Sequence, residues 1–285
     1  MSGTLYLVST PIGNLEDITL RALRILREEV SIIACEDTRQ TQKLIEHYQI
    51  KKPLISYHER NEASRTTEIL DSLERGHSVA LVSDAGTPLV SDPGYRVVKA
   101  AIDRAFTVVP LPGPSAVLAA FAASGLPSDE FRFIGFLPSK AGARRKALLG
   151  ILNTPGTVVA YESPHRILDT LAEIAEILGN APVVLAREIT KIHEEFLRGS
   201  AESIREQLAK RASIRGEITL ILGQPEKDAS SISDPLQEVL RLEAEQGLDR
   251  MQAIKTVAKQ LGLPKREVYR LAAEQGNNPR RKNRD

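Results

Sequence analysis

The chain has 285 residues, of which 42% are hydrophobic and 26% are charged. This composition is ordinary for a globular protein, and the length is sufficient for two or three domains. The formal net charge is +1, but residues 235–285 hold 11 Lys and Arg against seven Asp and Glu. We therefore expect any electrostatic attraction for nucleic acid to be local rather than spread over the whole chain.

The single cysteine, Cys35, excludes an internal disulfide and a cysteine-rich zinc site. We therefore expect chemistry that uses neither a metal nor a redox-active thiol, in a reducing compartment. The first residues lack the basic start and long apolar run of a signal peptide, and no run reaches the roughly 20 apolar residues that span a bilayer. These features predict a cytoplasmic protein without a membrane partner.

Short apolar runs alternate with helical patterns along the chain and predict a series of strands. These runs cover residues 5–8, 31–35, 78–82, 106–111, 157–161, 183–186 and 217–222. Helices are predicted between them, for example at 19–28 behind an Asp17 cap and at 63–74, ending near Gly76. The alternation predicts an α/β fold, and the continuous apolar strands indicate helices on both faces of a sheet.

Two breaks in the pattern predict the domain organisation. Two prolines flank Gly113, so no regular element can continue there, and we expect two α/β domains at 1–112 and 113–224. The polar stretch 225–234 is typical of a linker. Beyond it, residues 235–285 are predicted to form a small helical domain with a basic tail.

Helical patterns at 235–247, 250–261 and 266–274 make up that last domain. The third follows a glycine-containing turn and begins with Lys265 and Arg266, which is similar to a helix-turn-helix. Such an element favours contact with nucleic-acid phosphates. The alternative is a helical bundle for dimer contacts with a solvated tail.

Ligands of open α/β sheets bind beyond the carboxyl ends of the strands. The predicted strand 78–82 runs into Ser83-Asp84-Ala85-Gly86-Thr87-Pro88, and Ser91-Asp92-Pro93-Gly94 then starts the next helix. Together they form a long loop of small residues with two carboxylates. A carboxylate there can accept hydrogen bonds from ribose hydroxyls or an amino group, and glycine lets a flat ring approach the backbone. The loop matches neither GxxxxGK[ST] nor GxGxxG, which disfavours a phosphate cradle.

Three further predicted strands end in small or charged residues. Residues 106–111 lead into a proline-rich turn where Ser115 can cap a helix over 117–124, residues 157–161 lead into Glu162, and residues 183–186 lead into the charged segment 187–194. Side chains of this kind, gathered at one edge of a sheet, favour a ligand site. A domain hinge and solvated loops are the alternatives.

Seven short strings carry a family resemblance when they are taken together. In chain order they are Thr10-Pro11-Ile12-Gly13-Asn14, Cys35-Glu36-Asp37-Thr38-Arg39, Ser56-Tyr57-His58-Glu59-Arg60-Asn61-Glu62, the loop 83–88, and the segments 112–116, 161–166 and 187–194. The set resembles the bacterial ribosomal RNA small subunit methyltransferase I family, which belongs to the tetrapyrrole-methylase superfamily. The resemblance covers essentially the whole chain, and its specificity lies in the joint occurrence of the strings in this order.

This resemblance implies two α/β domains of the tetrapyrrole-methylase type, S-adenosyl-L-methionine in the cleft between them, and a homodimer. It also implies 2′-O-methylation of a cytidine in the decoding region of 16S ribosomal RNA. The implied cofactor contacts are Pro11, Val82, Ser83, Asp84, Thr87, Ser115, Ala116, Tyr161, Glu162 and Ile189. The superfamily often has Gly-Asp-Pro where this chain has Ser83-Asp84-Ala85, so backbone contacts carry over only approximately at that point.

Methyl transfer to a ribose hydroxyl calls for a positioned base or a cation, because the hydroxyl is a weak nucleophile at neutral pH. Lys191 is a candidate if desolvation lowers its pKa, and Glu62 and Asp37 are further candidates, with His58 and Glu162 as alternatives. Positioning of the two reactants could also supply most of the rate by itself.

Basic and histidine side chains on predicted loops and helix starts are candidates for RNA contact. They are Arg39, His58, Arg144, Arg145, Lys146, Lys265 and Arg266. Solvated helix faces or a hydrogen-bonded loop histidine are the alternatives at these positions. Aromatic residues make up 4% of the chain and tryptophan is absent, which favours recognition of a structured ribosomal surface over stacking on single strands. We therefore expect the assembled small subunit to be the preferred substrate.

Two other functions are compatible with these residues. One is methylation of a small corrin-type molecule by an enzyme of the same superfamily, although a macrocycle would need neither the basic helices nor the 140–146 cluster. The other is a non-catalytic ribosome-binding factor, which a test of cofactor binding would separate.

Overall fold

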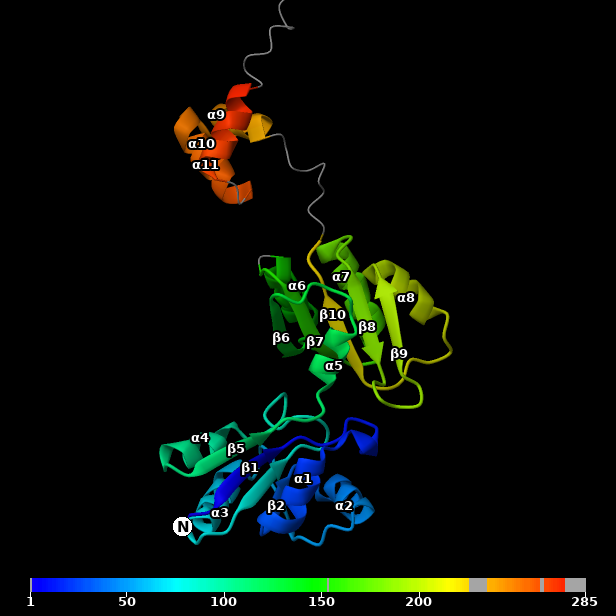
Figure 1. Cartoon of the computed structure of the whole chain (residues 1–285). Coiled ribbons are helices and arrows are strands. Elements are labelled where there is room, and N and C mark those ends of the chain that lie inside the picture. Colours follow the sequence, from blue (N-terminus) through cyan, green and yellow to red (C-terminus); the bar gives the residue numbers. More distant parts are fainter. Residues whose placement is uncertain (1, 153, 226–234, 262–263, 275–285) are drawn as a thin grey trace, which may run out of the picture. The chain divides into compact units, whose positions relative to one another are not determined.

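The computed structural model describes residues 2–152, 154–225, 235–261 and 264–274. The chain forms two compact units, Met1–Pro225 and Glu226–Asp285. The first unit contains two five-stranded sheets, and the described part of the second consists of three helices (Figure 1). None of the helices in the described ranges has the length and apolar character that crossing a membrane requires.

The first sheet is entirely parallel and has the strand order β3-β2-β4-β1-β5. Its strands are β1 (Thr4–Val8), β2 (Ile32–Cys35), β3 (Leu54–Ser56), β4 (Val79–Val82) and β5 (Thr107–Leu111). The central strand β4 is buried along its whole length, which explains why it contains apolar residues only. All five carboxyl ends therefore meet at one edge of this sheet.

Helices cover both faces of the first sheet, as predicted. One face packs against α1 (Leu20–Arg24), the π-helical turn η2 (Ile25–Glu29) and α2 (Thr38–His47). The other packs against α3 (Glu62–Glu74) and α4 (Tyr95–Asp103).

The predicted Asp17 cap is wrong. Asp17 lies inside the short helix η1 (Leu15–Asp17), and the Thr19 hydroxyl accepts the capping hydrogen bond from Ala22 N at 3.1 Å. Thr19 is therefore the residue that starts α1.

The second sheet is mixed and has the order β6-β7-β10-β8-β9. Its strands are β6 (Phe131–Phe136), β7 (Thr157–Glu162), β8 (Val183–Arg187), β9 (Glu195–Gly199) and β10 (Ile218–Leu222). Strand β10 runs antiparallel to both β7 and β8. The beginning of β10 therefore lies beside the carboxyl ends of its two neighbours.

The two faces of the second sheet have different partners. Three helices cover one face, namely α6 (Ala141–Leu152), α7 (Ile167–Leu178) and α8 (Ala201–Ala209). The other face packs against α5 (Ala116–Ala122) and against Ile12 from the loop after β1. Ser115 caps α5 as predicted, because its hydroxyl accepts from Leu118 N.

A β-bulge interrupts β6 and changes which face its last residue occupies. Phe133 pairs with Val159 and Phe136 pairs with Tyr161, so one extra residue lies between the two pairs. Gly135 sits at this point with φ +69°, a left-handed backbone that favours glycine. Simple alternation would place Phe136 on the face of Ile134, whereas the bulge turns it to the face of Tyr161.

The second unit consists of α9 (Pro235–Gln246), α10 (Arg250–Leu261) and α11 (Lys265–Glu274), as the sequence predicted. Apolar side chains from all three helices form its core, including Val239, Ile254 and Val268. Residues 226–234 of the predicted linker and the predicted basic tail lie outside the described residues. The division of the chain at 112 and 224 stays a prediction.

Candidate functional site

Three loops at the carboxyl edge of the first sheet are joined by hydrogen bonds. Thr10, after β1, exchanges two backbone hydrogen bonds of 2.9 Å with Gly86 in the loop after β4. The Thr10 hydroxyl also donates to Ser83 O at 2.8 Å. Thr87 Oγ1 donates to Pro114 O, in the turn after β5, at 3.2 Å. The three turns therefore form one surface, as expected for parallel strands.

A cavity of about 390 Å³ lies against this surface. Of the ten predicted cofactor contacts, it is lined by Asp84, Thr87, Ser115, Ala116, Tyr161 and Glu162. Its other lining residues are Ile12, Ala85, Gly86, Val90, Ser91, Asp92, Phe136, Ser163, Pro164 and the segment 216–219. The cavity thus brings residues from both sheets together.

The other four predicted contacts do not line this cavity. Val82 and Ser83 are buried beneath the loop that they begin, and Ile189 is buried in the apolar cluster that contains Ile12. Pro11 adjoins Ile12, which does line the cavity. Contacts from these four residues stay a prediction.

Two parts of the cavity wall that come from the second sheet were not predicted from the sequence. Residues 216–219 reach it because β10 is antiparallel, so that its start rather than its end lies at the site. Phe136 reaches it because of the bulge in β6, and its side chain lies against Tyr161 with ring centroids 5.3 Å apart. The glycine at 135 was the one local signal for the bulge.

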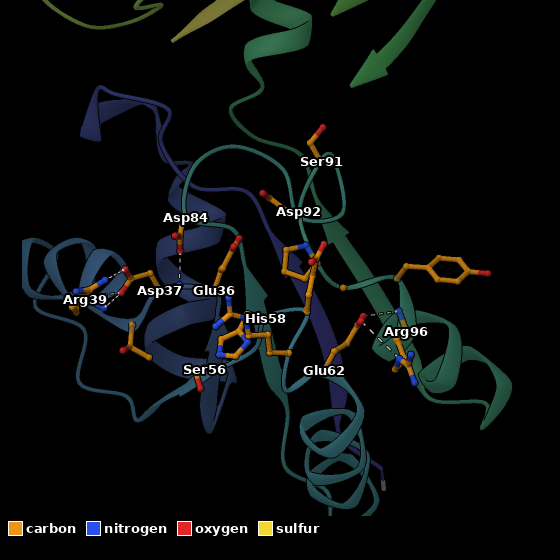
Figure 2. Close-up of a pocket in the computed structure, with 16 residues that line it drawn as sticks. Glu36, Asp37, Arg39, Ser56, His58, Glu62, Asp84, Ser91, Asp92 and Arg96 are labelled. Atoms are coloured by element: carbon orange, nitrogen blue, oxygen red, sulfur yellow. Dashed lines mark hydrogen bonds and ion pairs between the residues drawn. The ribbon is translucent and has the colours of Figure 1, made fainter. Parts of the chain in front are cut away.

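A second and larger cavity, of about 1110 Å³, adjoins the first. Its lining is mostly polar and charged, and Figure 2 shows these side chains around the ends of β2, β3 and β4. The residues are Glu36, Asp37, Thr38, Arg39, Ser56, His58, Glu59, Arg60, Glu62, Asp84, Ser91, Asp92, Pro93, Gly94, Tyr95 and Arg96. This one cavity is therefore lined by four residues that the sequence analysis singled out, namely Asp37, Arg39, His58 and Glu62.

Of the described residues, Asp84, Ser91 and Asp92 line both cavities. Asp84 Oδ1 accepts from Asp37 N at 2.9 Å, and Asp92 Oδ2 accepts from the Ser83 hydroxyl. Two ligands that fill the cavities would meet at these three side chains. Ser91 and Asp92 belong to the loop before α4 and were not predicted as site residues.

Carboxylates close to one another dominate the electrostatics of the shared wall. Partial burial raises the pKa of Glu36, and the charges of Asp84 and Asp92 raise it further. Burial likewise raises the pKa of Asp84, although the hydrogen bond from Asp37 N opposes the shift. For Asp92, burial raises the pKa against the effect of the Ser83 hydrogen bond.

The predicted base Asp37 has the opposite environment. The Arg39 side chain and backbone both donate to its carboxylate, and together they lower its pKa to about 2. Glu62, a second predicted base, accepts from the Tyr57 hydroxyl at 3.1 Å and lies 3.8 Å from Arg96. The cationic partner of Asp37 makes that carboxylate a weaker proton acceptor.

Lys191 lies on a third cavity, of about 740 Å³, formed by residues 13–15 and by Glu188, Thr190 and Ile192 with its neighbours. Its ammonium group is 2.8 Å from Glu188 Oε1 and 3.0 Å from Glu217 Oε2. Burial alone would lower the pKa of Lys191, but the hydrogen bonds to the two carboxylates outweigh it and the pKa is raised. The condition on which Lys191 is a candidate base, a pKa lowered by desolvation, is therefore not met.

The buried position and the hydrogen bonds of the Glu162 carboxylate do not suit it to act as a catalytic base. Its side chain is fully buried, pairs with Arg166, and accepts from Ser163 N at 2.6 Å and from the Thr170 hydroxyl at 2.8 Å. These bonds fix the turn after β7 and leave the backbone of Glu162 at the cavity.

The predicted RNA contacts are distributed over several places. Arg39 and His58 line the larger cavity, and the Arg39 side chain is 87% exposed. Lys146 is exposed on α6, and Lys265 and Arg266 are exposed at the start of α11. Arg145 is partly exposed and pairs with Glu176.

Arg144 differs from the other predicted RNA contacts because it is buried. It forms a two-fold hydrogen-bonded pair with Glu173 on α7. The predicted phosphate contact is not supported for Arg144, since a phosphate could reach it only if this pair broke. One member of the basic run Arg144-Arg145-Lys146 therefore faces the protein interior.

In the described part of the chain, no group of three or more His, Cys, Asp or Glu side chains could hold a metal ion.

Comparison with known proteins shows which family has this sequence and fold. A family model described as Tetrapyrrole (Corrin/Porphyrin) Methylases matches residues 4–205. A ribosomal RNA small subunit methyltransferase I from Halalkalibacterium halodurans is 48% identical over 269 residues, covering 92% of each chain. One of the same name from Micromonospora olivasterospora is 46% identical over 268 residues, covering 93% of this chain and 84% of the relative.

Solved structures show the same fold at lower identity. A uroporphyrin-III C-methyl transferase from Thermus thermophilus, complexed with S-adenyl homocysteine, has a TM-score of 0.53 at 21% identity and covers 78% of this chain and 97% of its own. A cobalt precorrin-4 methyltransferase has a TM-score of 0.58 at 16% identity, covering 77% and 94%. With a family model over most of its length and relatives nearly half identical to it, the chain belongs to the ribosomal RNA small subunit methyltransferase I family of the tetrapyrrole methylases.

Proposed function

We propose that this protein transfers a methyl group from S-adenosyl-L-methionine to the ribose 2′-hydroxyl of a cytidine in the decoding region of 16S ribosomal RNA. The observation that carries this proposal is the pair of adjoining cavities with a shared wall of Asp84, Ser91 and Asp92. Methyl transfer needs its donor and acceptor in contact and in line. A small cavity that opens on a larger one provides that contact.

The smaller cavity fits the proposed cofactor in size and chemistry. Its 390 Å³ lies within the range of about 300–1,000 Å³ that small-molecule sites occupy. Ile12, Phe136 and Tyr161 offer apolar surface to a flat ring, and Asp84 offers an acceptor to hydroxyl or amino groups. Gly86 lines the cavity and has φ +84°. This left-handed backbone conformation would be strained in a residue that has a side chain.

The chain's own residues would hold and orient the donor. Its bound sulfonium would supply an electrophilic methyl group. The hydrogen bonds between Thr10 and Gly86 and between Thr87 and Pro114 fix the loops that form the cavity, so little reordering is needed on binding. Pro11, Val82, Ser83 and Ile189 remain proposed contacts beside the six that line the cavity.

The larger cavity favours a nucleotide over a corrin precursor. Arginines at 39, 60 and 96 are suited to phosphate oxygens, whereas Glu36 and Asp92 can accept from ribose hydroxyls or from the amino group of cytosine. A small macrocycle would also make no use of the exposed basic residues of α6 and α11, whereas a nucleic acid can contact them through its phosphates.

We further propose that the assembled small subunit is the substrate, that the protein acts in the cytoplasm, and that it forms a homodimer. Lys265 and Arg266, at the exposed start of α11, would contact phosphates outside the catalytic cavities. Arg145 and Lys146 would add contacts from the exposed face of α6. The proposed domain boundary at 112 falls between the two sheets, and the one at 224 falls after the last strand of the second sheet.

The test is a methylation assay with isotopically labelled S-adenosylmethionine and small subunits from a strain that lacks the protein. We expect label on one cytidine ribose, located by mapping the modified nucleotide, and slower labelling of protein-free 16S transcript. Equal labelling of the transcript would overturn the preference for assembled subunits. Absence of cofactor binding by calorimetry would favour a non-catalytic ribosome-binding factor and overturn the proposal as a whole.

A further inference from the structure

We propose that Asp92 accepts the proton of the acceptor hydroxyl during methyl transfer. This inference rests on the proposed function and adds a catalytic residue to it. The acceptor oxygen must sit where the two cavities meet, because the methyl group arrives from the smaller one. Asp92 is one of the three described residues at that boundary, together with Asp84 and Ser91.

The three boundary residues differ in what they can do. Ser91 has a neutral hydroxyl, which is a poor base near neutral pH. Asp84 already accepts the backbone N–H of Asp37, which draws its carboxylate toward the loop between β2 and α2 (Figure 2). Asp92 is a carboxylate without such a backbone partner among the described residues, so it is the better proton acceptor of the three.

Ser83 positions this carboxylate from below. Its side chain is buried beneath the loop, and its hydroxyl donates to Asp92 Oδ2. Within the described part of the chain this bond engages one carboxylate oxygen, which leaves Oδ1 for the acceptor hydroxyl. A base held in one orientation loses less entropy in the transition state than a freely rotating side chain.

The groups that face Asp92 come from three strand ends. Glu36 follows β2, Asp84 follows β4, and Tyr161 lies in β7. Burial raises the pKa of Asp92, and the charge of Asp84 adds to this. Burial raises the pKa of Tyr161 to about 12, and the Asp92 charge contributes, so Tyr161 stays neutral beside it. A carboxylate with a raised pKa is a stronger base than one in water.

The proposed step balances as follows. The ribose oxygen forms a bond to the methyl carbon while the carbon–sulfur bond of the sulfonium donor breaks, and the bonding electron pair stays on sulfur. The hydroxyl proton moves to Asp92 Oδ1. The products are a 2′-O-methyl ribose, a neutral thioether and a protonated Asp92, which then returns its proton to solvent through the open larger cavity.

The experiment compares Asp92→Asn with the corresponding amide variants of two neighbouring acids, Glu36 and Asp84. Methyl transfer is measured under single-turnover conditions with labelled S-adenosylmethionine and small subunits. We expect Asp92→Asn to lower the transfer rate about 100-fold or more, which is the usual contribution of a general base. Its cofactor affinity, measured by calorimetry, should stay within about threefold of wild type. That binding measurement also shows that the variant is folded.

Glu36→Gln is the first control, since Glu36 lines the larger cavity but not the smaller one. Because Glu36 is a proposed nucleotide contact, we expect Glu36→Gln to weaken subunit binding, while its single-turnover rate at saturating subunits falls much less than that of Asp92→Asn. Asp84→Asn is the second control, and we expect it to weaken cofactor binding in proportion to its loss of activity.

A pH profile provides a test that does not depend on the Asn variant. Ser83→Ala removes the hydrogen bond that lowers the pKa of Asp92, so the acid limb of its single-turnover rate should move to higher pH. An unmoved limb, or an Asp92→Asn variant with near wild-type rate, would overturn the assignment while leaving the proposed function intact. A wild-type protein that transfers no methyl group to subunits would overturn both.

Discussion

Arg144 binds Glu173 through two hydrogen bonds, Nε to Oε2 at 2.9 Å and Nη2 to Oε1 at 2.7 Å. The pair joins α6 to α7, and both side chains are largely buried. The Glu173 hydrogen bond raises the pKa of Arg144, so the guanidinium stays charged. The pair therefore ties the two helices together from within.

The first prediction concerns this pair. Arg144→Met leaves Glu173 as a buried charge without its partner, and we expect a loss of about 3 kcal/mol in the free energy of unfolding. Chemical denaturation measures it. Arg145→Met is the matched control, because its pair with Glu176 is exposed and should change stability little. If the Arg144→Met protein were stable but bound small subunits more weakly, that result would instead support the RNA contact predicted for Arg144.

Lys191 provides the second prediction. Replacing it with Met leaves Glu188 without its cation, and we expect a loss of stability of about 1 kcal/mol with the acid limb of the transfer rate retained. Thermal unfolding and a single-turnover pH profile measure the two effects. Glu217→Gln removes the other, more exposed partner and serves as control. Disappearance of the acid limb in Lys191→Met would return Lys191 to the role of base.

Acid stability is the subject of the third prediction. Arg211 and Arg187 both pair with Glu195, and they lower its pKa from 4.5 to about 2, the Arg211 hydrogen bond being the largest cause. The folded pKa is below the unfolded one, so this stabilisation is present above pH 4.5 and is lost as the pH falls toward 2. We expect Glu195→Gln to melt at a lower temperature at neutral pH and to show a flatter acid dependence. Parallel wild-type and variant curves in that window would contradict the assignment.

The fourth prediction tests the wall that the bulge creates. Phe136→Ala removes an aromatic ring that is 59% exposed and faces the smaller cavity. We expect S-adenosylmethionine affinity to fall about tenfold, which corresponds to about 1.4 kcal/mol. Calorimetry measures this change. Phe131→Ala is the control, since Phe131 lies on the same strand but packs on Phe121 away from the cavity.

The fifth prediction concerns the second unit. Lys265→Gln combined with Arg266→Gln should weaken binding to small subunits. It should also lower the slope of log affinity against log salt concentration by about one to two, because fewer counterions are released on binding. Binding at several salt concentrations measures the slope. Cofactor affinity should not change, because it depends on the first unit. An unchanged salt slope would assign α11 to protein contacts instead.

Much of the fold followed from local patterns in the sequence. Six of the seven predicted strands have a neighbour on each side in their sheet, and β4, β7 and β10 among them are almost entirely buried. The seventh, β5, is a partly exposed edge strand that its apolar run nevertheless predicted. Strands β3, β6 and β9 were missed because they are partly exposed edge strands with polar or glycine positions, such as Arg132 and Gly199. Edge strands carry a weak periodic signal, since one of their sides has no partner.

The site was predictable where it lies directly after a parallel strand, as at Asp84 and Ser115. It was not predictable where distant pairing decides the geometry. The antiparallel course of β10 brings Glu217 to the cavity, and the bulge in β6 turns Phe136 toward it. The partner of Arg144 lies 29 residues away, so its burial could not be read from the basic run around it.

The pair of hydrogen bonds between Thr10 and Gly86 has a consequence for how the site opens. Thr10 N–H donates to Gly86 O and Gly86 N–H donates to Thr10 O, so a fluctuation that separates the two residues exposes both amides. Their protons should therefore exchange with deuterium at matching rates, both slowed equally when a ligand fills the smaller cavity. The loops after β1 and β4 would then open as a single gate rather than as two.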